Sequence, residues 1–445
     1  MAASVLWASY YPGIATLYAR DQGYTLYAPN GAVEAQNVTF TRLVPYLNYP
    51  LEYPFFAGLL MLLVNGVGYL IGLSSGPMAA LWGVVFLSPP MMGAGAAFVV
   101  LVWARARVPA YKALLLFALN PAVLDQFGIN FDMAGALMVL LSVYWLARGR
   151  RGASALALAL GAGVKGFPLI ALPLMAWYAG RPQPGDNGPV PGDPRRLRWR
   201  YALTALGAFA AGMALQYSLS PANWDRARGF LSGYGIEGSW LGLLWPGSVI
   251  NYHSFGTWEI GASTALRGLQ PFQLASAALL GLSLLAVWRH RARLDPKRAT
   301  FLLMSAVVMF WWYSPPQFLY YPLALLPLVA WDFKASLALS TAFGLFGNFT
   351  LWIRIPTSVL PITNGVWILI SAGYQASLAL WLAWEFGWLG RLWPRLGRGR
   401  FLAAPPAPAR APGAPSPSPS AGARATSGPF HGAERPSREG PNRRA

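Results

Sequence analysis

The sequence predicts an all-α fold: a polytopic transmembrane helical bundle with extracytoplasmic loops and a disordered C-terminal tail. Three observations predict it. The chain of 445 residues is 55% hydrophobic and only 11% charged, whereas soluble domains carry about 25% charged residues. Long apolar runs follow one another without strand-like alternation. The net charge of +19 comes from Lys and Arg residues that gather between these runs. A soluble globular enzyme, a coiled coil and a mostly disordered chain are therefore excluded.

The apolar runs set the expected helices. A spanning helix needs roughly 20 apolar residues, and we expect about 10–12 spans when short hairpin helices are included. Clean candidates are 81–103, 201–219, 272–288, 335–353 and 365–388. Shorter runs lie at 113–129, 133–147, 152–164, 166–180, 299–313 and 316–331. Several of these are too short to span without tilt, and some are candidates for half-helices that meet inside a bundle.

The C-terminal part of the chain differs in composition. From Arg391 onward the sequence consists largely of Arg, Pro, Gly, Ala and Ser, and no apolar period remains. Such a segment cannot bury enough surface to offset its ordering entropy. We therefore expect a membrane domain over 1–390 and a disordered cytoplasmic tail over 391–445.

The positions of Lys and Arg predict the orientation, because cytoplasmic loops are enriched in them. If 81–103 runs from outside to inside, alternation places the basic clusters within 105–112, 148–151, 181–200 and 289–298 in the cytoplasm, together with the tail. Most acids and the isolated Lys165 then fall on the extracytoplasmic side. The basic charge thus reports topology in a cell membrane and predicts contact with membrane lipids, not with nucleic acid.

Known motifs narrow the chemistry. The chain has no cysteine and three His. It lacks a Gly-x-x-x-x-Gly-Lys-Ser/Thr phosphate loop, a His-Glu-x-x-His helix and an Asp-x-Asp pair, so ATP-driven transport and metal-dependent hydrolysis are not expected. The acids, one Lys and aromatic loops at the outer boundary suit general-base catalysis on a lipid-carried substrate. A carboxylate would deprotonate an acceptor hydroxyl while cations hold a phosphate leaving group.

Four segments carry a resemblance to a known family. They are residues 45–54 (PYLNYPLEYP), 130–132 (NFD), 161–168 (GAGVKGFP) and 314–318 (SPPQF), with 237–240 (EGSW) as a fifth candidate. In this order and spacing they resemble elements of the glycosyltransferase C superfamily, and particularly glycosyltransferase family 87. Members of that family are polyprenyl-phosphate-mannose-dependent mannosyltransferases. Each segment alone is a weak signal. From the first to the last, the resemblance spans about residues 40–330, three quarters of the chain.

The resemblance implies a membrane hexosyltransferase. It would move a hexose, mannose by this likeness, from a polyprenyl-phosphate sugar donor to a lipid-linked or glycan acceptor on the extracytoplasmic face. The family's base is an acid early in the first external loop, followed by an aromatic element. If that element is matched at Tyr24 and Tyr27, Asp21 is the base and Glu34 is the fallback; if it is matched at Leu17-Tyr18, no acid occupies the place of the base. No cofactor follows from the sequence, no residue is assigned to a metal, and a divalent metal ion is left open. The alternative function is a multi-pass transporter or flippase for a lipid-linked or small solute.

Each of the other candidate residues has a functional and a structural interpretation. As catalytic or substrate-binding groups we expect Glu52, Asp132, Lys165, Gln317 and Arg226, with Lys165 holding the lipid phosphate. The alternatives are structural. Asp132 could cap a helix, Lys165 could extend to the interface, Glu52 could be an interfacial loop acid, Arg226 could be solvated and Gln317 could line a pore. An isolated Lys at membrane depth is costly, which favours a function for Lys165.

Overall fold

The computed structural model of the chain describes its helical middle and several shorter pieces. All described residues belong to the first of the two units into which the chain divides, Met1–Ala403. They are 25–27, 39–41, 46, 53–60, 101–103, 105–106, 108–121, 123, 132–186, 192–225, 235–236, 239–245, 248, 250–254, 257–260, 270–314, 316–329, and 333–334, 336–338, 340–342, 344–345, 372–373, 375–376, 379–380 and 383. The expected tail and most of the runs at 81–103, 335–353 and 365–388 lie outside them.

The central element is a helical hairpin. Helix α7 (Asp132–Ala147) and helix α8 (Arg151–Ala162) are joined by a tight turn. Gly149 in this turn has φ of 73°, a left-handed conformation that glycine adopts without steric cost. The two helices pack along their length. Both were predicted, from the apolar runs 133–147 and 152–164.

The hairpin is followed by a short and then a long helix. The 3-10 helix η2 (Phe167–Ala171) leads into α9 (Leu172–Ala179), within the predicted run 166–180. Helix α10 (Pro194–Leu219) begins seven residues before the predicted 201, and its N-terminus has a clear cause. The Asp193 side chain accepts a hydrogen bond from the backbone N–H of Arg195, and proline occupies the first helical position.

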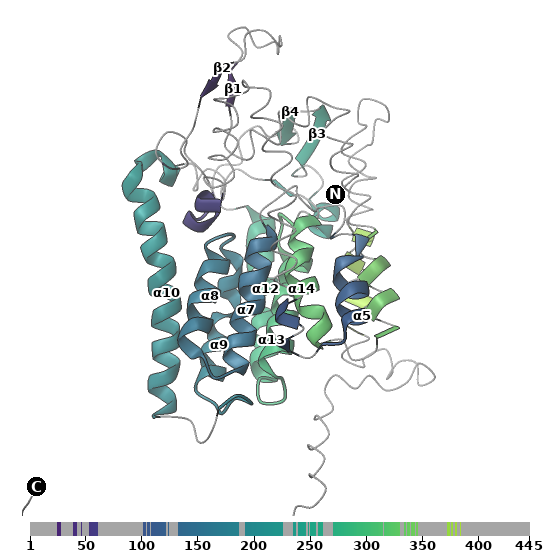
Figure 1. Cartoon of the computed structure of the whole chain (residues 1–445). Coiled ribbons are helices and arrows are strands. Elements are labelled where there is room, and N and C mark those ends of the chain that lie inside the picture. The colour runs from purple at the N-terminus through teal and green to yellow at the C-terminus, as the bar shows by residue number, and fades with distance from the viewer. Residues whose placement is uncertain are drawn as a thin grey trace, which may run out of the picture. The chain divides into compact units, whose positions relative to one another are not determined.

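The second half of the bundle contains three helices in succession. Helix α12 (Pro271–Arg289) starts with a capping box between Gln270 and Gln273. Helix α13 (Pro296–Phe310) starts with Asp295, whose side chain accepts from the Arg298 N–H. The 3-10 helix η5 (Pro316–Leu319) leads into α14 (Tyr320–Val329), which is almost wholly buried and packs against α13 and α7. Figure 1 shows these helices running side by side.

Smaller elements complete the described part. Helix α5 (Ala110–Ala113) continues into the π-helix η1 (Leu114–Ala118), and η3 (Trp240–Leu243) is a 3-10 turn. Strand β1 (Thr25–Tyr27) pairs with β2 (Thr39–Thr41), and β3 (Ile250–Ser254) with β4 (Thr257–Ile260), both antiparallel. These strands were not predicted, since three to five residues are too few for a readable alternation. The described part is otherwise helical, as expected.

A buried polar cluster joins three helices within this core. The hydroxyls of Ser142 on α7, Ser154 on α8 and Tyr201 on α10 lie within 3.3 Å of one another, and Ser154 also donates to the Ser142 carbonyl at 2.7 Å. All three residues are buried, so each hydroxyl must find a partner inside the protein. The cluster satisfies them mutually and ties α10 to the hairpin.

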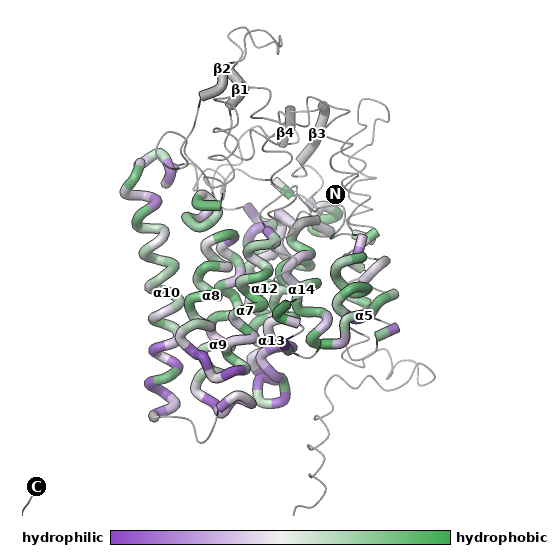
Figure 2. The backbone as a smooth tube through the Cα atoms, in the orientation of Figure 1, coloured by the Kyte–Doolittle hydropathy of each residue, from purple (hydrophilic) through white to green (hydrophobic). Residues whose placement is uncertain are grey.

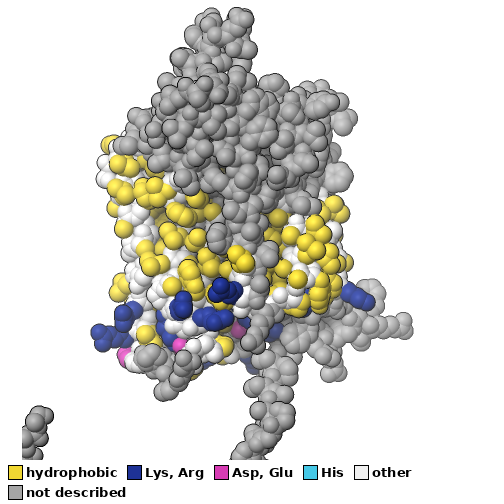
Figure 3. All heavy atoms as spheres, in the orientation of Figure 1, with side chains coloured by type: hydrophobic (Ala, Val, Ile, Leu, Met, Phe, Trp, Pro, Cys, Tyr) yellow, Lys and Arg dark blue, Asp and Glu magenta, His cyan; other side chains and the backbone are white. Residues whose placement is uncertain are grey.

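The helices expose large apolar side chains. Among the described residues, α10 and α12 are long and apolar enough to span a bilayer. Leu203 on α10 is 65% exposed and Leu282 on α12 is 62% exposed, and further Leu residues accompany them. Figure 3 shows apolar side chains over much of the described surface on the side turned to the viewer. Soluble monomers rarely expose a contiguous apolar patch of this kind.

Basic residues gather at one end of the helices. Figure 2 shows the polar residues at the lower ends of α9, α10 and α13, and Figure 3 shows Lys and Arg side chains below the apolar side chains. We call this the basic end. It comprises the α7–α8 turn, the segment 181–200 and the α12–α13 connection, all of which were predicted to lie on one side.

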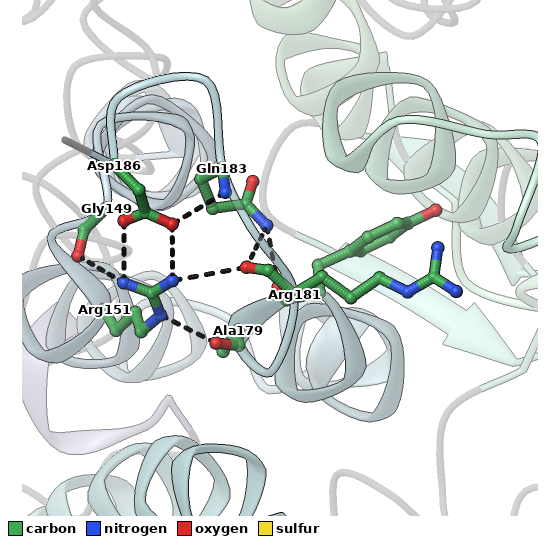
Figure 4. A network of polar contacts seen from close by, with 7 residues as sticks. Gly149, Arg151, Ala179, Arg181, Gln183 and Asp186 are labelled. Carbon is green, nitrogen blue, oxygen red and sulfur yellow. Dashed lines mark hydrogen bonds and ion pairs between the residues drawn. The ribbon is translucent and has the colours of Figure 1, made fainter. Parts of the chain in front are cut away.

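One ion pair organises the basic end. The Arg151 guanidinium donates to both carboxylate oxygens of Asp186, at 3.0 and 2.7 Å, and to the carbonyls of Gly149, Ala179 and Arg181 (Figure 4). The Gln183 N–H also donates to Asp186. The hydrogen bonds from Arg151 hold the pKa of the Asp186 carboxyl below its usual value. This pair anchors the loop after α9 to the start of α8.

We expect Asp186→Asn to lower the free energy of unfolding at pH 7 by about 1–2 kcal/mol, because charge-assisted hydrogen bonds are lost. A carboxyl with a depressed folded-state pKa stabilises above its unfolded pKa, near 3.9, and loses that contribution as the pH falls through the folded value. The stability gap between wild type and variant should therefore close below about pH 4. Thermal unfolding in detergent from pH 7 to pH 3 measures it.

Asp193→Asn is the matched control for this experiment. It removes an acid from the same connection, but Asn caps a helix as well as Asp does. The control should stay near wild type throughout. A gap for Asp186→Asn that persists unchanged at pH 3 would contradict the assignment.

Candidate functional site

The hairpin geometry brings two of the predicted site residues together. Asp132 is the first residue of α7, and Lys165 follows the last turn of α8. Because α7 rises for 16 residues and α8 returns beside it, both lie at the end opposite the basic end. The length of α7 separates the two ends by roughly 24 Å. The sequence named both residues, and the fold makes them neighbours.

The two side chains form a buried ion pair. Lys165 Nζ lies 3.8 Å from Asp132 Oδ2, with the Asp132 side chain fully buried and the Lys165 side chain 7% exposed. The Tyr321 hydroxyl, at the start of α14, donates to Asp132 Oδ1 at 3.5 Å. Burying an ammonium and a carboxylate is costly unless they are paired. The pair therefore links α7, the end of α8 and α14.

Two aromatic rings lie close to the ammonium group, and two further rings pack in sequence beside them. Lys165 Nζ lies 4.3 Å from the centre of the Tyr53 ring and 5.5 Å from that of Phe318. Phe167 packs between Phe318 and Tyr321, with ring centres 4.8 and 4.6 Å away. Cation–π attraction is strongest where water is excluded, as it is here. We call Tyr53, Phe167, Phe318 and Tyr321 the aromatic cage.

The segment that carries Tyr53 is held by a polar network. The Tyr46 hydroxyl donates to the Pro54 carbonyl at 2.7 Å, and Tyr46 itself has φ of 69°, which is uncommon for a residue other than glycine. The Gln216 side chain of α10 donates to the Tyr53 carbonyl at 3.0 Å. The N–H of Ala57, in the short helix 55–60, donates to the Gly163 carbonyl at 2.9 Å. Three separate elements thus fix the Tyr53 backbone.

Glycines allow the close packing around the pair. A Cβ at Gly161 would lie 3.3 Å from the Gly135 carbonyl, so α7 and α8 approach closely beside the site. A Cβ at Gly163 would lie 2.9 Å from Cβ of Phe56. A Cβ at Gly135 would overlap the Tyr321 hydroxyl. Gly161 and Gly163 therefore serve close packing, whereas a Cβ at Gly166 would meet nothing within 4 Å.

The other predicted site residues are not placed by the structure. Asp21, Glu34, Glu52 and Arg226 lie outside the described residues. Gln317 lies in η5, but its side chain is outside the described part. Four of the sequence segments nevertheless meet at the pair, through Tyr53, Asp132, Lys165 and Phe318. From the fifth, Trp240 donates through its indole to the Met309 carbonyl and through its backbone to Gln375.

Sequence reasoning missed Tyr321 and Gly135. Tyr321 follows the segment 314–318 by three residues and opens the next apolar helix, which is the signal that could have found it. Gly135 lies one turn after Asp132, at the spacing that places it on the same helix face. Among the described residues, no group of three or more His, Cys, Asp or Glu could hold a metal ion.

Comparisons with protein-family models and with curated proteins find no match for this chain. The site is therefore interpreted from its own geometry. That geometry combines one buried cation, its counter-ion and an aromatic surround, at the end of the helices that lacks the Arg clusters.

We expect Gly135→Ala to displace the Tyr321 hydroxyl from Asp132, because the added methyl group takes its place. Overpacking of this kind costs about 1–3 kcal/mol. The measurement is thermal unfolding in detergent, with Gly152→Ala as control. A Cβ at Gly152 meets nothing within 4 Å, and this change should be neutral or slightly stabilising. Equal effects of the two changes would argue against the Tyr321 contact.

We expect Lys165→Met to cost about 3–5 kcal/mol of stability, because it leaves the Asp132 carboxylate buried without its partner. The double variant Asp132→Asn with Lys165→Met removes both charges and should recover most of that loss. Unfolding of the four members of this double-mutant cycle measures the coupling free energy. Additive losses would show that the two side chains do not stabilise each other.

Proposed function

We propose that this chain is a multi-pass membrane glycosyltransferase. It transfers a hexose, mannose by resemblance, from a polyprenyl-phosphate donor to a lipid-linked or glycan acceptor at the extracytoplasmic face. The observation that carries the proposal is the convergence of four resemblance-bearing segments on the buried Lys165. Each segment resembles an element of that glycosyltransferase family, and each contributes a side chain to the ion pair or to the aromatic cage.

Membrane insertion is supported by the outer surface of the helices. The exposed leucines of α10 and α12 would be unfavourable in water and suit a lipid environment. The shorter apolar helices, Asp132–Ala147, Phe167–Ala179 and Tyr320–Val329, are largely buried and would sit within the bundle. The Arg clusters at one end agree with a cytoplasmic side, which leaves Lys165 on the outer side.

Lys165 suits the phosphate of a lipid-linked donor. An ammonium is a compact charge that binds phosphate as a point charge. In the aromatic cage it is shielded from water, so its attraction for a leaving phosphate is strengthened. Asp132 keeps the site electrically balanced before the donor binds, and Tyr321 holds the carboxylate in place.

The transfer itself needs a base from the outer loops. Asp21 would take the proton of the acceptor hydroxyl, whose oxygen attacks the anomeric carbon of the donor sugar. The bond between that carbon and the phosphate oxygen breaks, and polyprenyl phosphate leaves with the electron pair beside Lys165. Glu34 is the fallback base, and Glu52, Gln317 and Arg226 would contact sugar, acceptor or phosphate. A divalent metal would find its ligands among residues of the same loops.

A transporter is the second candidate, and one observation favours it. Buried Asp–Lys pairs at membrane depth also occur along the pathways of transporters. In that case the pair would exchange partners with a passing solute, and no sugar would be transferred. The two functions differ in whether a glycosidic bond forms.

The test is sugar transfer by purified protein supplied with polyprenyl-phosphate-mannose and a lipid or glycan acceptor. We expect Asp21→Ala to lower kcat/KM by about 10²–10⁴. Lys165→Gln should lower it by about 10²–10³, the usual cost of losing one electrostatic donor. Asp225→Asn, which removes an exposed acid expected on the same side, should leave transfer unchanged.

Exchanging the two charged residues distinguishes a purely structural role of Lys165 from a role in phosphate binding. Asp132→Lys combined with Lys165→Asp keeps an ion pair but moves the cation to α7. We expect it to recover stability relative to Lys165→Met and to remain inactive. Recovery of full transfer would make the pair purely structural. Retained activity in both Asp21→Ala and Glu34→Ala would exclude both bases, and solute uptake into proteoliposomes without transfer would favour the transporter.

A further inference from the structure

Two guanidinium groups at the basic end lie against the same indole ring. The guanidinium carbon of Arg181 lies 3.8 Å from the centre of Trp177, and that of Arg291 lies 5.3 Å from it. Arg291 also lies 4.5 Å from the centre of Trp288. Because both distances are measured from one ring, the two guanidinium carbons lie at most about 9 Å apart. They come from different elements, the end of α9 and the end of α12.

The nearby acids are engaged elsewhere. Asp186 pairs with Arg151, and Asp295 caps α13 and contacts Arg298. Within the described part of the chain, neither Arg181 nor Arg291 has a carboxylate partner. Figure 4 shows the Arg181 side chain extending away from the Arg151–Asp186 pair. Two like charges thus lie against one ring, and the described acids near them, Asp186 and Asp295, form their ion pairs with other Arg residues.

A third arginine side chain, that of Arg198, packs against the residue before Arg181. Gly180 has no side chain, and a Cβ there would lie 2.7 Å from Nε of Arg198 on α10. Nε of Arg198 and Nε of Arg291 are both buried without a hydrogen-bond partner. A buried donor of this kind normally has an acceptor, because leaving it unpaired is costly. These two donors are an independent indication of an absent acceptor.

The backbone holds this cluster in place. The Tyr178 hydroxyl, at the end of α9, donates to the carbonyls of Arg291 and Leu294 at 3.1 and 3.0 Å. The Arg181 carbonyl accepts from Arg151 and from Gln183. The main chain of both residues is therefore anchored, and the Arg291 guanidinium is itself positioned by a hydrogen bond from Nη1 to the Trp288 carbonyl at 2.7 Å. Such preorganisation lowers the entropic cost of binding an anion.

We propose that Arg181, Arg291 and Arg198 bind the phosphate of an anionic phospholipid headgroup. Guanidinium groups match phosphate oxygens by bidentate hydrogen bonds. Along α10 the exposed Leu203 follows Arg198 by five residues, and along α12 the exposed Leu285 precedes Arg291 by six, so acyl chains on these apolar faces would end near the arginines. Basic pockets between spanning helices on the cytoplasmic side bind such lipids. The inference rests on the membrane insertion proposed above, and not on sugar transfer.

The test is titration of delipidated, detergent-solubilised full-length protein with phosphatidylglycerol or phosphatidylcholine, with bound lipid counted by native mass spectrometry. We expect phosphatidylglycerol to bind about tenfold more tightly in wild type, and Arg181→Gln with Arg291→Gln to abolish that preference. The control, Arg196→Gln with Arg200→Gln, removes two exposed charges from the same end and should retain it. No sugar donor is present, so the outcome does not depend on the proposed transferase activity.

Several outcomes overturn the proposal. They are no preference for the anionic lipid in wild type, equal loss in both double variants, or full competition by soluble glycerol phosphate, which would make the site one for a free phosphate. If the Gln double variant fails to fold, Arg181→Lys with Arg291→Lys decides instead. It keeps both charges without the planar fork, and we expect binding at least about threefold weaker. Wild-type binding by this Lys variant would reject the guanidinium site.

Discussion

The buried ion pair between Asp132 and Lys165 is the constraint on which the end of the described helices opposite the basic end depends. A carboxylate and an ammonium in an apolar interior are tolerated only together. Their pairing therefore requires α7, the end of α8, and Tyr321 on α14 to meet at one point. The aromatic cage and the glycines beside it follow from that meeting, because the rings must cover the ammonium and the backbones must come close enough to permit the contact.

The two ends of the described helices differ in how their charged side chains are paired and covered. At the end opposite the basic end, Lys165 is enclosed by the Asp132 carboxylate and aromatic rings. At the basic end Arg151 is paired with Asp186, while Arg181 and Arg291 lie against Trp177 and have no carboxylate partner within the described residues. The first arrangement excludes water from the charge, and the second leaves guanidinium groups at a more exposed end of the helices.

The sequence predicted most described helices, because long apolar runs specify them. It misplaced the starts of α10 and α13, since Asp193-Pro194 and Asp295-Pro296 extend each helix into charged residues that hydropathy discounts. The sequence also identified Asp132 and Lys165 as candidate site residues, but not as partners in an ion pair. Their pairing could not be predicted, because it depends on how closely Gly135 and Gly161 let two helices cross. Nor could the contact with Tyr321, which arrives from a helix about 190 residues away in sequence.

The cluster of Ser142, Ser154 and Tyr201 has a consequence for motion in the bundle. Helix α10 buries little of its surface, so apolar packing alone would let it slide or rotate against the hairpin. A slip of one turn, about 5.4 Å, would separate all three hydroxyls and leave them unsatisfied in an apolar interior. The cluster therefore fixes the axial position of α10 against the hairpin, although the apolar surface of this helix alone would not.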